Sequence, residues 1–388
     1  MLKIVFFTTW LPRRCGIATF AYDLTKAIDK VSQGIIWQVI ALDDPGSTTK
    51  YDSKVIFKID RTNPKDYIRA AHYINQSDLD LVIIHHEFNL YGKHGGGRIL
   101  FFLRKLKKPS VIVFHSIPHP SDRHYPEKKK KIQIAQKIAH YVNKIVVFCP
   151  SARQRLIDIY QIEPRKIVVI PHGSPYFPRA NTTAIKKKLG FNPHDIILLN
   201  FGFVRPRKNL ELIIQAMPEV VKMFPQVKLL IVGTGGSHPQ AHIELKRYIT
   251  QLKKIIKKLN IEKNIIFITR FLPYKEMVEF YQAADVFVYA NRYSSQLSSG
   301  PLTYALVAGK AVVTTFFRYA YDILNKNRGI IVPIRNSEAL AGAVCKILSD
   351  HKLKKRLEKN AYNLGRNLLW EEVSKDYIQL FNLILNKK

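Results

Sequence analysis

The sequence is short of cysteines, acidic side chains and long apolar runs, and each shortage excludes a class of protein. Its 388 residues include three cysteines, Cys15, Cys149 and Cys345, which lie far apart and show no paired spacing. A disulfide framework and a zinc ribbon both need paired cysteines. The sequence therefore excludes both scaffolds and fits a reducing cytosol.

No apolar run approaches the roughly 18 residues that a membrane-spanning helix needs. The apolar stretch at Lys3–Phe7 leads directly into Leu11-Pro12-Arg13-Arg14, without the length or the small-residue cleavage site of a signal peptide. We therefore expect a buried first strand at the N-terminus, no transmembrane helix and a cytoplasmic location.

Acidic residues are half as common as basic ones: 29 Asp and Glu stand against 62 Lys and Arg, a formal net charge of +33. This excess fits either the solvated surface of a lysine-rich protein or attraction to polyanions such as nucleoside diphosphates and anionic lipids. Nucleic acid is not expected, because zinc-finger, RNP-type and basic-zipper patterns are missing. Lys128–Lys131, at the start of an expected helix, would either contact an anionic membrane or form the solvated end of a packed helix.

Short β-branched runs alternate with amphipathic stretches along the whole chain. Runs such as Lys3–Phe7 and Ser110–Phe114 predict buried parallel strands, and stretches such as Ile17–Lys30 predict helices. The segment Pro171–Thr183, rich in turn-forming residues, predicts a domain boundary, and the alternation restarts at Ile196–Phe201. The sequence therefore predicts an α/β protein with two doubly wound parallel sheets.

Two turns between a strand and a helix combine glycine with cations. In Pro12–Phe20, Gly16 would let backbone N–H groups approach an anion at a helix N-terminus, although an ordinary βα turn has the same pattern. In Asn200–Leu210, Arg205 and Lys208 lie at the mouth of the turn. Two cations beside a helix N-terminus suit a diphosphate.

The second turn resembles the Gly-x-x-x-x-x-Lys-(Gly/Asn) turn of family 4 glycosyltransferases. Four more segments agree with that family in order and spacing: Ile170–Gly173, Ile231–Gly235, Phe271–Glu276 and Ala283–Val288. The resemblance implies the GT-B fold, with two Rossmann-like domains facing across a cleft. The implied parts are an acceptor-side domain at 1–175, a nucleotide-sugar domain at 176–369 and a final helix at 370–388 that crosses back to the first domain.

Within the family, the sequence is similar to the mannosyltransferase-like branch. Arg13–Phe20, His86-Glu87-Phe88 and Gln296–Ala305 carry this similarity. The family usually has two glutamates, eight positions apart, where this chain has Gln296 and Tyr304. Gln296 can still hydrogen-bond a sugar hydroxyl, whereas the one phenolic oxygen of Tyr304 is a poorer ribose clamp than a carboxylate.

The resemblance also implies roles for individual residues. It assigns catalytic contacts to His115, Arg205, Lys208 and Gln296, although His115 could instead be a hydrogen-bonded core histidine. It assigns donor and nucleotide contacts to Cys15, Gly16, Gly202, Gly233, Arg270, Phe271, Leu272, Ser299, Gly300, Pro301, Leu302 and Tyr304. Acceptor-side candidates are Arg13, His86 and Glu87, and Glu87 could instead cap the following turn.

We expect no metal and no other cofactor. The histidines at 85, 86, 94, 115, 119 and 124 are numerous, but no two have the spacing of a ligand pair. The resemblance to family 4 glycosyltransferases implies that cationic side chains of the protein, in place of a metal ion, stabilise the leaving diphosphate.

The function that the resemblance implies is transfer of a hexose, with mannose from GDP-mannose favoured. The anomeric configuration is retained, and the acceptor is a glycan or a lipid-linked molecule in surface polysaccharide synthesis. Peripheral contact with the inner face of an anionic membrane is expected. The alternatives are an epimerase or sugar phosphorylase on the same fold, or a non-catalytic GT-B protein that binds a polyanion or a partner.

Overall fold

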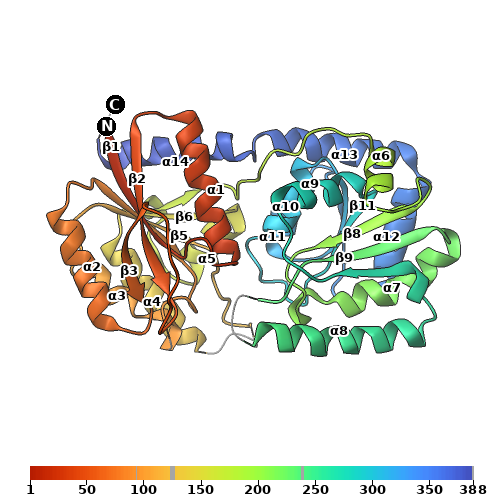
Figure 1. Cartoon of the computed structure of the whole chain (residues 1–388), viewed down its shortest axis with the longest axis horizontal. Helices are drawn as coiled ribbons and strands as arrows, with labels where there is room; N and C mark the ends of the chain where they lie inside the picture. The colour runs from red at the N-terminus through yellow and green to blue at the C-terminus, as the bar shows by residue number, and fades with distance from the viewer. Residues whose placement is uncertain (93, 123–126, 237–239, 387–388) are drawn as a thin grey trace. The chain divides into compact units, whose positions relative to one another are not determined.

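The chain forms two compact units in the computed structural model, which describes residues 1–92, 94–122, 127–236 and 240–386 (Figure 1). Unit 1 contains Met1–Gly173, Ser295–Ser298 and Trp370–Lys388. Unit 2 contains Ser174–Ser294 and Ser299–Leu369. Each unit has its own sheet.

The described part of unit 1 is built on a seven-stranded sheet in the order β3-β2-β1-β4-β5-β6-β7, with every neighbouring pair parallel. Its strands are β1 (Leu2–Thr8), β2 (Ile35–Asp43), β3 (Val55–Asp60), β4 (Leu81–His86), β5 (Ser110–Phe114), β6 (Lys144–Val147) and β7 (Ile167–Val169). The strand order reverses between β1 and β4. In open α/β sheets, ligands bind beyond the carboxyl ends of the strands at such a point.

Helices cover both faces of this sheet (Figure 1). They are α1 (Gly16–Val31), α2 (Pro64–Gln76), α3 (Ile99–Leu103), α4 (Lys128–Tyr141), α5 (Pro150–Asp158) and α14 (Trp370–Ile384), with short 3-10 turns η1 (His94–Gly96) and η2 (Pro164–Lys166). The helix α14, from the end of the sequence, packs against α1 from its beginning. Phe20 of α1 contacts Trp370 of α14 edge to face, with ring centroids 4.7 Å apart.

Unit 2 has, in its described residues, a six-stranded parallel sheet in the order β10-β9-β8-β11-β12-β13. Its strands are β8 (Ile196–Phe201), β9 (Val227–Val232), β10 (Ile265–Ile268), β11 (Val286–Tyr289), β12 (Ala311–Thr315) and β13 (Ile330–Val332). The order reverses between β8 and β11. The carboxyl ends of these two strands are therefore where this sheet would bind a ligand.

The helices of unit 2 are α6 (Thr182–Lys188), α7 (Leu210–Met223), α8 (Ala241–Lys258), α9 (Tyr274–Ala283), α10 (Gly300–Val307), α11 (Arg318–Leu324), α12 (Ser337–Ser349) and α13 (His351–Arg366), with 3-10 turns η3 (Pro206–Lys208) and η4 (Glu262–Asn264). Four of them, α7, α8, α12 and α13, bury apolar faces in one core with strands of the sheet. Within the described ranges, no helix has both the length and the apolar character needed to cross a bilayer.

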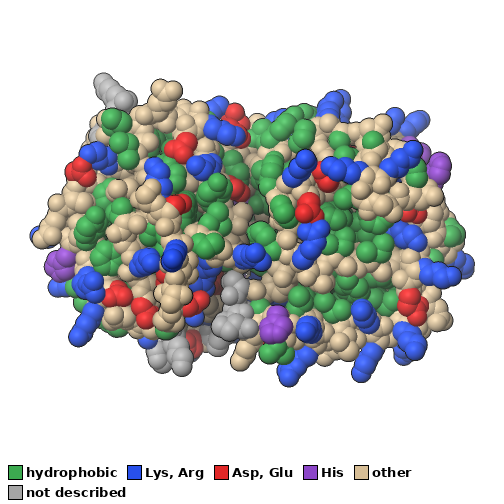
Figure 2. Space-filling view, viewed as in Figure 1, with side chains coloured by type: hydrophobic (Ala, Val, Ile, Leu, Met, Phe, Trp, Pro, Cys, Tyr) green, Lys and Arg blue, Asp and Glu red, His purple; other side chains and the backbone are tan. Residues whose placement is uncertain are grey.

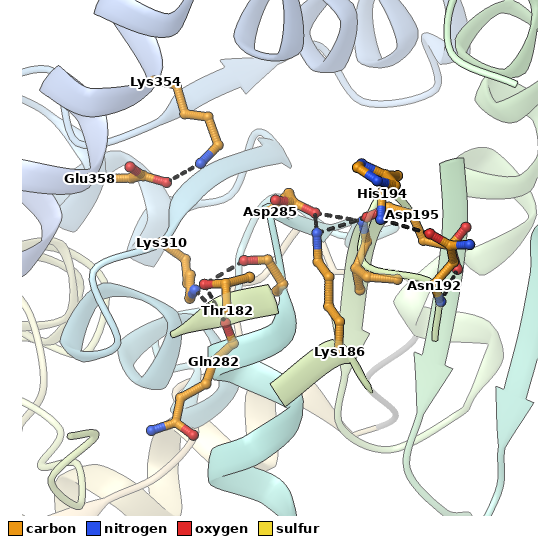
Figure 3. Close-up of polar contacts among 12 residues, drawn as sticks. Thr182, Lys186, Asn192, His194, Asp195, Gln282, Asp285, Lys310, Lys354 and Glu358 are labelled. Atoms are coloured by element: carbon orange, nitrogen blue, oxygen red, sulfur yellow. Dashed lines mark hydrogen bonds and ion pairs between the residues drawn. The ribbon is translucent and has the colours of Figure 1, made fainter. Parts of the chain in front are cut away.

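Two lysines, the buried Lys186 and the partly buried Lys310, stabilise the amino-terminal edge of this second sheet (Figure 3). Lys186 of α6 donates to the Asp285 carboxylate at 2.7 Å, and Asp285 also accepts the backbone N–H of Ile197 in β8. Lys310, directly before β12, donates to the carbonyls of Gln282 and Ala284, which lie at the C-terminus of α9. The carboxyl-terminal edge, on the opposite side, is not involved in these contacts.

The two parallel sheets, one in each unit, confirm the predicted α/β fold with two doubly wound sheets. Each predicted apolar run named above forms a strand, and the strands are parallel in both units.

Candidate functional site

Two glycines bring the ends of β8 and β9 into direct contact. Gly233 has a φ of 145°, and a Cβ there would lie 1.8 Å from the carbonyl oxygen of Gly202. Gly202 has a φ of 127°, and its added Cβ would meet Pro301 of α10 at 3.1 Å. Only glycine fits such close backbone approaches. The turn after β8, the end of β9 and the start of α10 therefore meet in one place.

The start of α10 is a capped helix N-terminus. The Ser299 hydroxyl accepts the backbone N–H of Leu302, and Gly300 and Pro301 form the first turn. The remaining first-turn amides and the helix dipole make this end positive, which suits an anion. The sequence-predicted residues Gly202, Gly233, Ser299, Gly300, Pro301 and Leu302 are thus brought together, although Leu302 itself is fully buried and can contribute only its backbone.

Tyr289, the last residue of β11, links Lys208 to the start of α10, because its hydroxyl is hydrogen-bonded to both Lys208 and Ser299. The Lys208 ammonium donates to the Tyr289 hydroxyl, stands 4.5 Å from the centroid of its ring and is only 7% exposed. Burial lowers the pKa of Lys208, and the nearby Tyr289 opposes that shift. Burial raises the pKa of Tyr289, but Lys208 and hydrogen bonds from Lys208 and Ser299 reverse the net shift, so its pKa is lowered.

Arg205 supplies a second cation on the same turn. Its guanidinium lies 5.1 Å from the ring centroid of Phe203, and its buried Nε–H has no hydrogen-bond partner among the described residues. Burial lowers the pKa of Arg205, and the neighbouring Arg207 lowers it further. A buried unpaired N–H on a cation is costly, and an anionic ligand would satisfy it.

The loop after β10 is more varied. Arg270 forms an exposed ion pair with Glu276, Phe271 is 46% exposed and Leu272 is buried. Tyr304 of α10 packs in a layer of aromatic rings with Phe177 and Tyr281, at centroid distances of 6.1 and 6.3 Å. The carboxylate that the family usually offers at this position is replaced by part of an aromatic layer.

In unit 1, the turn after β1 forms the N-terminus of α1. Cys15 is the N-cap, and its sulfur accepts the backbone N–H of Ala18 at 3.4 Å. Gly16 is exposed, and an added Cβ would meet no atom within 4 Å. Arg13 pairs with Asp44 at 3.0 Å, so its charge is partly neutralised. The open space over Gly16 is compatible with a ligand.

His115 follows β5 and lies among aromatic side chains. Its Nε2 is 3.2 Å from Nδ1 of His85, and its ring packs edge to face against Phe20. Burial lowers the pKa of His115 well below its ordinary value, and the neighbouring histidines add to the shift. The carbonyl of His115 accepts the Ser298 hydroxyl at 3.1 Å, and Gln296 donates to the carbonyl of Ser298 at 2.5 Å. Gln296 therefore belongs to the surroundings of His115 in unit 1.

One acceptor-side expectation, His86, needs correction. His86 is completely buried, stacked on Tyr91 at 5.2 Å, and neither ring nitrogen has a hydrogen-bond partner in the described structure. Burial lowers its pKa to about 3. A side chain without exposed surface cannot meet an acceptor, so His86 is a core residue.

Glu87 has the turn-capping role that was one of its two interpretations. Its carboxylate accepts the backbone N–H of Asn89 at 2.8 Å and the hydroxyl of Ser116 at 3.2 Å.

The Lys128–Lys131 run is partly buried. Lys131 is 2% exposed and faces Phe88, and the half-buried Lys128 donates to the carbonyl of Pro120. Lys129 and Lys130 are exposed, and Lys130 approaches Glu127 at 3.8 Å, so only part of the run is a solvated basic surface.

Metal ligands do not gather in the described residues, where no three His, Cys, Asp or Glu side chains form a possible site. His124 and the side chain of His94 lie outside the described residues. Sequence reasoning missed two residues that the geometry makes important, Tyr289 and His85. Their one sequence signal is a polar group at the carboxyl end of a predicted strand.

This combination of two Rossmann-like sheets and cations at strand ends agrees with comparisons to known proteins. Residues 15–174 match the family model "Glycosyltransferase Family 4", and residues 181–364 match the model "Glycosyl transferases group 1". The chain therefore belongs to the glycosyltransferases that these two models describe, and the expectation of a family 4 glycosyltransferase is confirmed.

Individual relatives agree with this family. The alpha-monoglucosyldiacylglycerol synthase of Streptococcus pneumoniae is 25% identical, over 95% of this chain and 84% of the relative. The synthase of the same name from Acholeplasma laidlawii is 24% identical, over 88% of this chain and 90% of the relative. The structure of Anabaena HepE in complex with UDP and glucose superposes with a TM-score of 0.78 and 15% identity, covering 99% of this chain and all of that one. That likeness shows the GT-B fold.

Proposed function

We propose that this glycosyltransferase moves a hexose from a nucleoside diphosphate sugar, with retention, to a lipid or lipid-linked acceptor. The observation that carries the donor half is the pair of cations Arg205 and Lys208 beside the N-terminus of α10, at the strand-order reversal of unit 2. A buried lysine, a partly buried arginine on the same turn and a helix N-terminus are suited to the charge that develops on a departing diphosphate.

In this proposal the protein needs no nucleophile of its own. The bond between the anomeric carbon and the diphosphate oxygen breaks, and its electron pair leaves with the diphosphate. The acceptor hydroxyl attacks the oxocarbenium-like carbon from the same face, and its proton passes to the leaving phosphate oxygen. Arg205, Lys208 and the first-turn amides of α10 would stabilise the leaving group, and His115 and Gln296 would contact the sugar.

Two donors are candidates. The similarity of Arg13–Phe20 and Gln296–Ala305 to mannosyltransferase-like enzymes favours GDP-mannose. The names of the two lipid synthases favour a glucosyl group and a diacylglycerol acceptor, and HepE was solved with UDP and glucose. Because three relatives agree in naming glucose, UDP-glucose with diacylglycerol is the first pair to test.

The deciding experiment measures release of nucleoside diphosphate from UDP-glucose and GDP-mannose, with and without diacylglycerol in mixed micelles. Transfer predicts release that depends on the acceptor and a radiolabelled glycolipid product. Release from GDP-mannose alone would reassign the donor. The proposal would be overturned if no product formed and no nucleoside diphosphate was released with either sugar donor, whether the acceptor was diacylglycerol or a glycan.

A non-catalytic GT-B protein is the second candidate, because Tyr304 replaces a carboxylate with a packed aromatic ring. It predicts thermal stabilisation by UDP or GDP with no turnover of any sugar donor. An epimerase or phosphorylase would instead convert its substrate without an acceptor lipid.

A further inference from the structure

His85, which is buried, and His115, which is partly buried, form a histidine pair at the carboxyl edge of the sheet of unit 1. His85 is near the end of β4, His115 directly follows β5, and these two strands are neighbours. Nδ1 of His85 lies 3.2 Å from Nε2 of His115. His85 has no exposed surface, and Phe20 packs on both rings, at centroid distances of 5.3 and 4.9 Å.

Both rings are neutral at physiological pH, because burial lowers the pKa of His85 to about 3 and that of His115 well below its ordinary value. Each ring then carries one proton, and the contact needs one donor and one acceptor. The direction of donation therefore decides the tautomer of both rings.

The surroundings of His85 select one direction. Its second nitrogen, Nε2, is buried and has no hydrogen-bond partner in the described structure. If His115 donated, the proton of His85 would sit on Nε2 as a buried, unsatisfied N–H, the more strongly avoided kind of orphan group. If His85 donates from Nδ1, only a bare lone pair is left there. The second arrangement is the less costly one.

Donation by His85 leaves His115 with its proton on Nδ1. This nitrogen has no hydrogen-bond partner among the described residues and is not one of the fully buried unpaired atoms, so it remains accessible. The backbone of His115 is held as well, by its N–H to the carbonyl of His86 and by the Ser298 hydroxyl on its carbonyl. His115 is therefore fixed in both orientation and tautomer.

We propose that His85 is a positioning residue that holds His115 in the Nδ1–H tautomer, so that His115 presents a hydrogen-bond donor to an oxygen of the transferred sugar. The tautomer follows from the histidine pair alone, and the sugar contact rests on the proposed function. The Nδ1–H of His115 can bond only to a sugar that has an oxygen at that position. It therefore favours such a sugar over one that lacks the oxygen at the same ring carbon.

The first test reads the tautomer directly, without substrate. Long-range ¹H–¹⁵N spectra of ¹⁵N-histidine-labelled full-length protein distinguish the two neutral tautomers, and His115→Gln identifies the His115 signals. We expect His115 in the Nδ1–H form. His172, whose Nδ1 lies 2.7 Å from the carbonyl of Gly173, is an internal reference for that form. A His115 spectrum in the Nε2–H form would overturn the proposal.

A matched pair of variants separates positioning from packing. His85→Asn keeps an N–H near the place of Nδ1, and His85→Leu has a similar size without a donor. We expect His115 to keep the Nδ1–H form in H85N and to lose it in H85L. The same tautomer in both variants would show that His85 does not set it. If H85L unfolds, loss of the Nδ1–H form in H85N would still contradict the proposal, and the wild-type spectrum still tests the tautomer itself.

Kinetics test the second step. We expect H85L to reduce kcat/KM for the sugar donor about tenfold, as for one lost hydrogen bond, while the dissociation constant of the free nucleoside diphosphate stays unchanged. H85N should recover most of the loss. Equal loss in both variants, or weaker diphosphate binding, would contradict a role through the sugar contact. A protein with the expected tautomer but no transferase activity would overturn the proposed function and leave the tautomer assignment standing.

Discussion

Lys208 holds a positive charge in a place where water cannot stabilise it, against the ring and hydroxyl of Tyr289. We expect Lys208→Ala and Arg205→Ala each to cost about 2–4 kcal/mol of transition-state stabilisation, because each removes a preorganised cation from the leaving group. The measurement is kcat with the donor established by the release assay.

A matched control separates charge from folding. Lys208→Met keeps most of the buried volume and should lose activity like Lys208→Ala, whereas replacement of the exposed Lys263 by Ala should change nothing. Circular dichroism and the melting temperature report the fold. Wild-type turnover in both the Lys208 and the Arg205 variants would remove these cations from the site.

Asp23 of α1 gives the stability of the protein a specific pH dependence. Burial raises its pKa from 3.8 to about 7, and the neighbouring Trp370 indole opposes this only in part. The folded protein keeps the proton up to about pH 7, whereas the unfolded chain releases it near pH 4. The contribution is therefore complete below about pH 4 and is lost as the pH rises through 7.

We expect Asp23→Asn to remove this dependence. The free energy of unfolding of the variant minus that of the wild type should be about 2–4 kcal/mol larger at pH 7 than at pH 4. Urea unfolding at several pH values measures it, and replacement of the exposed Asp158 by Asn is the control. Parallel pH profiles for Asp23→Asn and the wild type would show that Asp23 does not carry the proton.

At the residue scale, motif positions were predictable and side-chain directions were not. Arg205 and Lys208 were found because their turn matches a family pattern, and the structure places both at a strand end. His85 and His86 are neighbours in β4, and successive residues of a strand point to opposite faces. One of them meets His115 and the other meets Tyr91 and Phe88, which a linear sequence without a sheet order cannot distinguish.

The helix α6 depends on one buried ion pair, shown in Figure 3. The side chains of Lys186 and Asp285 are 7% and 22% exposed. We expect Asp285→Asn to lower the free energy of unfolding by about 3–5 kcal/mol, because a buried ammonium would lose its charged partner. Urea unfolding at constant pH measures the change.

The exposed pair Lys375–Glu372 in α14 provides the comparison, since its side chains are 58% and 48% exposed. Glu372→Gln should cost less than about 1 kcal/mol. Similar losses for both pairs would mean that burial does not determine the effect. The double change Lys186→Met with Asp285→Asn should recover much of the loss, because no charge is then left unpaired and the Asn oxygen can still accept the backbone N–H of Ile197.

At the element scale, central strands were predictable because they are apolar on both faces. The edge strand β3 was missed, since most of its residues are half-buried and Lys58 interrupts the apolar run. The helix α3 was missed because five residues are too few to show a helical period.

For the whole molecule, the charge predicts peripheral and salt-sensitive binding to anionic membranes. The larger exposed basic surface is α8, whose six cations at 246, 247, 253, 254, 257 and 258 form no ion pair with a described carboxylate. Figure 2 shows Lys and Arg side chains along the part of unit 2 where α8 lies in Figure 1. Each such cation near an anionic surface can contribute about 1 kcal/mol.

We expect co-sedimentation with phosphatidylglycerol vesicles at low salt and its loss at high salt. Replacing the lysines at 253, 254, 257 and 258 by Gln should weaken binding more than replacing those at 128, 129 and 130. Binding to phosphatidylcholine vesicles that equals binding to anionic ones, or no loss in the α8 variant, would assign the charge to solvated surface.

The two-sheet architecture was predictable at this scale because the strand-helix alternation restarts after residue 183 and both halves contain enough apolar residues for a core. The membership of Ser295–Ser298 in unit 1 was not, because four residues inside a motif carry no sign of the unit they pack with.

The pairing of α1 with α14 has a consequence for how the protein is made. The ribosome synthesises α1 before the second unit and α14 after it, so the nascent first unit lacks this cover until the second unit has been translated. During that time the Phe20 ring of α1 lacks its contact with Trp370. Folding of the first unit is therefore completed only after the second unit has been synthesised, and until then chaperones that recognise apolar helices have a target on α1.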